Sequence, residues 1–177
     1  MSPNWTSVPL ENTDNIKVPF FEDARTDFAP NYASDKKLSA AISEATAEFG
    51  KLSATVLEFQ RRLFTVNNQR RHGYFIRFSL QGRIGLIRVA GLPMRNETPQ
   101  KEERVRVQCL LNVRDWLKTA VTLQVFSPDT SPLIPYLLMP GGDGQQTVAE
   151  YILKLDRLPE LAAPKPSNVV DGVIEPV

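Results

Sequence analysis

The sequence predicts an α+β fold: a three-stranded antiparallel sheet with one face covered by an N-terminal helix, a long helix and a short C-terminal helix, flanked by extended N- and C-terminal arms. Two observations predict it. Apolar residues recur at helical spacing in three separate stretches, and the segment between the first two alternates apolar and polar residues around a tight turn. Helices on one face of the sheet leave the other face free, and a ligand would lie there.

The first helix is predicted to follow the candidate caps Ser34 and Asp35 and to end at Gly50. Its apolar residues are three or four positions apart, so they form one stripe. They are Leu38, Ala41, Ile42, Ala45 and Phe49.

Three strands are predicted where β-branched and aromatic residues alternate with polar ones, over residues 54–66, 73–80 and 84–92. The alternation places three apolar residues of the first strand on one face, namely Leu57, Phe59 and Leu63. In the second strand Tyr74 falls on one side, and Phe75 and Arg77 fall on the other. Gln81-Gly82-Arg83 gives the clearest hairpin signal.

Two further helices are predicted after the sheet. The long one covers residues 101–123, with Pro99 near its first turn and Cys109 on its apolar stripe. The short one begins with the capping box formed by Thr147 and Glu150 and ends at Pro159.

Both ends of the chain lack helical or strand periodicity and are rich in proline. The predicted organisation is therefore an extended or disordered arm over residues 1–33, a single domain over residues 34–158, and a Pro-rich tail over residues 159–177. No secretory signal and no membrane-spanning segment are expected, and a cytoplasmic location in a bacterial or phage-infected cell is predicted.

Positive charge is concentrated in the middle of the chain. The protein has 21 Lys and Arg and 20 Asp and Glu residues, a net charge of +1. Eleven of the 21 basic residues lie between Arg61 and Arg106, where only three carboxylates occur, so this stretch has a charge of about +8. Concentrated positive charge among aromatic residues is typical of a protein that binds a polyanion.

The candidate nucleic-acid-binding residues combine cations for phosphates with rings on which unpaired bases stack. They are Arg61, Arg62, Arg70, Arg71, Tyr74, Phe75, Arg77, Arg83, Arg88, Lys101 and Arg104. The alternative is that these arginines only keep the surface solvated and that Glu102 and Glu103 pair with some of them. Double-stranded RNA binding domains share the helix, three strands, helix order, which is an analogy of topology alone.

No constellation for catalysis, metal binding or cofactor binding is evident, so the chain is predicted not to be an enzyme. His72, the sole histidine, is predicted to be a solvated turn residue because no second histidine or neighbouring carboxylate accompanies it. Cys109, the sole cysteine, is predicted to be a small buried hydrophobic residue.

Several short pieces of sequence occur in an order that resembles a group of uncharacterised bacteriophage, prophage and mobile-element proteins. They are Gly82-Arg83, Gly91-Leu92-Pro93, Lys101-Glu102-Glu103-Arg104, Trp116-Leu117-Lys118, Pro135-Tyr136-Leu137-Leu138-Met139-Pro140 and Thr147-Val148-Ala149-Glu150. The resemblance covers about residues 38–155. It implies a phage or mobile-element protein near replication or recombination, and it assigns no activity or site.

The predicted function is that of a non-enzymatic, phage-type nucleic-acid-binding protein that favours single-stranded DNA or RNA. One alternative is an interaction factor that engages a host or phage replication or defence protein through its Pro-rich arms. That alternative would need an exposed apolar patch on the sheet, from Ile84 and Leu86 or from Ile87 and Val89. The other is a structural assembly component. All three are compatible with self-association through a free sheet edge.

Overall fold

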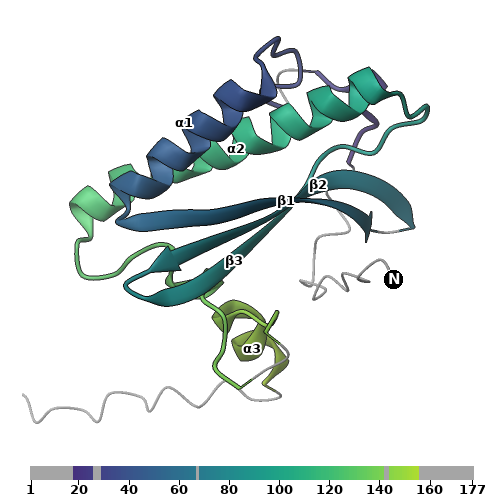
Figure 1. Ribbon diagram of the computed structural model, residues 1–177. Helices are drawn as coiled ribbons and strands as arrows, with labels where there is room; N and C mark the ends of the chain where they lie inside the picture. Colours follow the sequence, from purple (N-terminus) through teal and green to yellow (C-terminus); the bar gives the residue numbers. More distant parts are fainter. Residues whose placement is uncertain (1–17, 26–28, 67, 142–143, 156–177) are drawn as a thin grey trace, which may run out of the picture.

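The computed structural model describes residues 18–25, 29–66, 68–141 and 144–155, and it confirms the predicted α+β fold (Figure 1). The three strands form one antiparallel sheet in the order β1-β2-β3. The elements in chain order are η2 (Phe21–Asp23), α1 (Leu38–Lys51), β1 (Ala54–Val66), β2 (Gln69–Leu80), β3 (Arg83–Ala90), α2 (Pro99–Phe126), η3 (Ile134–Tyr136) and α3 (Val148–Lys154).

The helix starts differ in how well the sequence predicted them. Helix α1 is preceded by Lys37 and has no side-chain cap, so the predicted caps Ser34 and Asp35 are wrong. The start of α3 is confirmed, and α2 begins at Pro99, two residues before the predicted start. Thr98 caps α2 ahead of Pro99, and α3 has the complete capping box of Thr147 with Glu150.

Helices α1 and α2 lie side by side on one face of the sheet, which we call the helix face (Figure 1). The core between them and the sheet includes the fully buried residues Phe49, Tyr74, Ile76, Phe78, Leu110 and Leu117. Because side chains alternate along a strand, the neighbours of these β2 residues point to the opposite face, which we call the far face.

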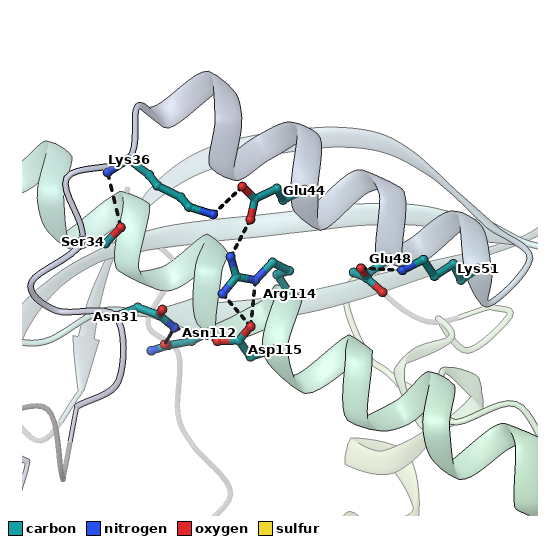
Figure 2. Close-up of polar contacts among 9 residues, drawn as sticks. All are labelled: Asn31, Ser34, Lys36, Glu44, Glu48, Lys51, Asn112, Arg114 and Asp115. Carbon is teal, nitrogen blue, oxygen red and sulfur yellow. Dashed lines mark hydrogen bonds and ion pairs between the residues drawn. The ribbon is translucent and has the colours of Figure 1, made fainter.

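A polar network fastens α1 to the outer side of α2 (Figure 2). Arg114 of α2 forms ion pairs with Glu44 of α1 and with Asp115. The Asn31 amide donates to the Asp115 carboxylate over 2.9 Å, which ties the segment before α1 to the same network. Apolar packing therefore sets the helix pair on the sheet, and charged groups at its surface fix the relative position of the two helices.

Local backbone features shape the sheet. The predicted hairpin is present, and its loop has two residues because Arg83 already belongs to β3: Gln81 and Gly82 both have positive φ, at 50° and 77°. A bulge interrupts the β1–β2 register between Val56 and Glu58, and the intervening Leu57 is 53% exposed. The prediction that Leu57 shares the buried face of Phe59 is therefore wrong, because periodicity alone does not reveal an extra residue.

The segment after α2 turns around the β3 edge. Leu138 N–H donates to the Ile84 carbonyl over 2.8 Å, and Leu137 forms a β-bridge with Gly85. Val148 packs on the core of the helix face, whereas Glu150 pairs with Arg88 of the far face. Helix α3 thus lies at the β3 edge, on the side of the sheet away from α1 and α2 (Figure 1).

Residues 18–25 and 29–33 form a segment packed against the start of α2, which we call the strap. Phe21 is buried in a small apolar cluster with Leu92 and Val105, and its N–H donates to the Pro93 carbonyl over 2.8 Å. The prediction of an extended or disordered arm is therefore wrong for the strap. Residues 1–17 and the predicted tail over 159–177 lie outside the described residues.

Among the described residues, no helix is both long enough and apolar enough to cross a membrane.

Candidate nucleic-acid interface

The far face carries an arginine from each of its three strands. Phe75 and Arg77 of β2 point to this face, as predicted, because Tyr74 and Ile76 point into the core. The register places Arg88 of β3 opposite Phe75, and Arg62 of β1 falls on the same face. Two of these guanidinium groups, those of Arg62 and Arg88, lie over the Phe75 ring.

Neither candidate aromatic residue offers a free ring face. Tyr74 is 1% exposed in the core under the helices, and Phe75 is 3% exposed on the far face. The Arg62 and Arg88 guanidinium groups lie 5.1 and 5.6 Å from the Phe75 ring centroid, at cation–π distance. Rings buried to this degree cannot accept a stacked base, so the predicted stacking role of Tyr74 and Phe75 is corrected. On this face, an unpaired base could stack only on the planar guanidinium groups.

Arg88 is already occupied. Its guanidinium lies 2.6 Å from the Glu150 carboxylate and also donates to the Gln145 carbonyl. Burial of the Glu150 carboxyl opposes its ionisation, but hydrogen bonds from Thr147 and Arg88 outweigh this effect and lower its pKa. The pair therefore holds α3 at the sheet edge.

Arg62 and Arg77 are half-buried on the far face, and neither forms an ion pair with any residue that the structure describes. Arg62 donates to the Gln60 side chain over 2.8 Å. The Nε atoms of both arginines are buried and have no hydrogen-bond partner in the part of the chain that the structure describes. A partly desolvated cation without a counterion is unfavourable, so an incoming anion gains more here than beside a solvated lysine.

A second group of cations lies at the start of α2. The Lys101 ammonium is 2.7 Å from Glu22 of the strap, and Arg70 is 3.7 Å from Glu97. Arg104 is exposed and stands over the Phe21 ring, with 5.9 Å to the centroid. Arg61 is exposed beside a cleft of about 260 Å³ that Glu102 and Arg106 also line.

Arg71 and Arg83 differ in their surroundings. Arg71 donates to the Gly91 carbonyl over 2.6 Å, and burial lowers its pKa. It braces the chain after β3 and is not presented to a ligand. Arg83 is exposed beside the Gln81-Gly82 hairpin and has no partner within the described ranges.

His72 is not the predicted solvated turn residue. Strand β2 begins at Gln69, four residues earlier than predicted, so His72 lies within it and is 8% exposed on the helix face. Its Nδ1 is 3.2 Å from Arg106, which pairs with Glu102 at 2.6 Å, and its Nε2 is 3.6 Å from Glu97. Arg106 is likewise buried in this cluster, so it contributes to packing more than to surface charge.

Cys109 is a buried hydrophobic residue, as predicted. It is 1% exposed, and burial raises the pKa of its thiol to about 12, so it is a neutral thiol at physiological pH. Across the described part of the chain, no three His, Cys, Asp or Glu side chains are grouped so that they could hold a metal ion.

Sequence reasoning missed the acidic residues of the strap. Glu22 and Asp23 pair with Lys101 and Arg95, and both follow Phe20-Phe21 in a segment predicted to be an arm. Adjacent aromatic residues in an otherwise polar stretch were the available signal, because two such rings seldom stay in water.

Comparison with known proteins assigns no family to this arrangement: no protein-family model, no curated protein and no solved structure matches the chain. The resemblance to phage and mobile-element proteins stays a prediction.

Proposed function

We propose that this protein is a non-enzymatic nucleic-acid-binding protein that contacts the phosphates of single-stranded DNA or RNA. One observation supports it above all: Arg62 and Arg77 are half-buried on the far face and form no ion pair within the described residues, although Glu58 lies opposite Arg77 in the register. Phosphate oxygens are the acceptors that such guanidinium groups lack.

Cations elsewhere on the molecule, at the start of α2 and near the β2–β3 hairpin, add to the proposed contacts. Arg61, Arg70, Arg83 and Arg104 are exposed, and Lys101 is partly exposed. We assign these residues to phosphate contacts, and we leave the internally bonded Arg71 and Arg88 out of that role. Apart from α3 at the β3 edge, no described helix covers the far face, and an open sheet face suits an unpaired strand better than the groove of a duplex. The proposal includes a cytoplasmic location in a bacterial or phage-infected cell.

The test is a fluorescence-anisotropy titration with labelled single- and double-stranded oligonucleotides at about 50 and 200 mM salt. Wild type should bind the single strand more tightly, and the affinity should fall steeply with salt. The double substitution Arg62→Gln and Arg77→Gln should weaken binding about tenfold and reduce the slope of log affinity against log salt by about 0.7 for each lost phosphate contact.

Lys118→Gln provides the matched control, because Lys118 is an exposed cation on α2 and belongs to neither cation group. Its affinity should equal that of wild type. A loss of binding free energy in the control half as large as that in the double variant would show that only net charge matters. Absence of binding by wild type at the lower salt concentration would reject the proposal.

The second candidate is a protein-interaction factor, and a different surface favours it. An interaction factor is expected to expose an apolar patch on β3. That patch is largely covered, since Leu86 and Ile87 are buried and, of its residues, only Ile84 is clearly exposed. The last turn of α2 instead exposes Val125 and Phe126, at 73% and 82%. Loss of partner capture by Phe126→Ser, with unchanged oligonucleotide affinity, would favour this candidate.

A further inference from the structure

Two carboxylates of the strap, those of Glu22 and Asp23, form ion pairs with cations at or just before the start of α2. One Glu22 oxygen accepts from the Lys101 ammonium over 2.7 Å, and the other accepts from the Arg95 backbone N–H over 3.2 Å. The Asp23 carboxylate accepts hydrogen bonds from both terminal nitrogens of the Arg95 guanidinium, and the bond from Nη1 is 2.9 Å long. The Lys101 hydrogen bond lowers the pKa of Glu22 to about 2, so Glu22 is ionised at every physiological pH.

Aromatic contacts hold the strap in this position independently of the charges. Phe21 is buried in the cluster with Leu92, and the Phe20 ring lies 4.9 Å from the Arg95 guanidinium. The carboxylates that follow these rings are thereby kept at the surface that Arg95, Lys101 and Arg104 form. Their two negative charges offset most of the three positive ones.

The two ion pairs differ in exposure: the Lys101 and Glu22 side chains are 31% and 22% exposed, so this pair is half-buried, whereas the Arg95–Asp23 pair is exposed and therefore weak. The paired side chains of Arg95 and Asp23 are 53% and 47% exposed, and exposed ion pairs contribute at most about 1 kcal/mol. Two successive phosphates of a nucleic-acid strand carry the same charge as Glu22 and Asp23, and a longer strand adds contacts elsewhere. A polyanion can therefore displace the carboxylates from these cations.

We infer that Arg95, Lys101 and Arg104 form a phosphate-contacting surface and that Glu22 and Asp23 of the strap compete with nucleic acid for it. The inference rests on the proposed function. The strap is a built-in competitor: it lowers the affinity for any single phosphate, so that only a ligand with several phosphates in reach of the cations binds well.

The experiment compares full-length wild type with the double substitution Glu22→Gln and Asp23→Asn, using a labelled single-stranded oligothymidylate at about 50 mM salt. The amides keep the size and acceptor oxygens of the side chains and remove only their charge. The variant should bind about two- to fivefold more tightly, because one competing ion pair is exposed and the other is only half-buried. Its affinity should also depend more steeply on salt.

Two matched substitutions make the result specific. Glu44→Gln removes one negative charge, half of what the double variant removes, at the α1–α2 network (Figure 2) and should leave the affinity unchanged. Adding Lys101→Gln to the double variant should abolish the gain. A thermal melt verifies folding, and should the double variant melt early, Asp23→Asn alone supplies the comparison.

The outcomes separate the two claims. Wild-type affinity in the double variant would overturn the competition and leave the proposed function standing. A gain that persists after Lys101→Gln, or that Glu44→Gln reproduces, would overturn the assignment of this surface. Binding by neither wild type nor the double variant would overturn the proposed function as well.

Discussion

At the scale of single residues, a histidine and two glycines show how a position in the fold defines a role. His72 stands beside two arginines in the sequence and looks solvated, but strand alternation turns it under α2. Gly85 and Gly91 lie where neighbouring side chains leave no room for a Cβ atom. A Cβ atom at Gly85 would lie 2.2 Å from the Phe78 ring.

Gly85→Ala should destabilise the protein by about 1–3 kcal/mol, because the buried Phe78 ring must leave its position to admit the methyl group. Urea denaturation followed by circular dichroism measures the change. Gly50→Ala at the end of α1 is the matched control: nothing lies within 4 Å of its Cβ position, so we expect unchanged or slightly raised stability. Equal effects of the two substitutions would contradict the packing argument.

At the scale of elements, α3 depends on polar contacts more than on buried area. It has seven residues, none of them buried, and is held by its capping box and by the Arg88–Glu150 pair. A helix this short is unstable alone, so these contacts decide whether it forms.

Thr147→Ala should cost about 1 kcal/mol and act locally, because it removes the acceptor for the Glu150 N–H at the start of α3. Hydrogen exchange of the α3 amides should accelerate, while exchange in β2 should stay slow. Thr119→Ala in the middle of α2 is the control, since its hydroxyl only donates to a carbonyl of its own helix. Acceleration throughout the sheet would show that α3 is instead part of the cooperative core.

At the scale of the whole molecule, ion pairs link the strap, the helices and the β3 edge. Each of them depends on a carboxylate that must stay ionised. Hydrogen bonds from basic side chains lower the pKa of Glu22, Glu44 and Glu102. The pKa values of Asp115 and Glu150 are lowered as well, although burial opposes it.

Stability should therefore fall in acid. A carboxyl whose folded pKa is below its unfolded value of about 4 stabilises the fold above that unfolded value, and the contribution disappears as the pH falls through the folded pKa. We expect the urea midpoint to decrease from about pH 4.5 downward, toward the pKa of about 2 of Glu22. Glu22→Gln should show a smaller decrease, and a midpoint constant to pH 2.5 would contradict the assignment.

The sequence by itself determined the element order, the hairpin after Leu80, the position of Pro99 in the first turn of α2, the capping box of α3, and the side of β2 on which Arg77 lies. These features depend on neighbours close in the chain, whose spacing and conformational preferences are readable without a fold. The candidate cations were likewise identified from composition alone.

Only the tertiary structure decided which of those cations are available. Arg88 pairs with Glu150, Arg106 with Glu102 and Lys101 with Glu22, and the first and last partners come from segments 62 and 79 residues away. The burial of Phe75, and the packing of the strap that was predicted to be an arm, have the same origin. Ion pairing and burial depend on distance in space, which the spacing of residues along the chain does not contain.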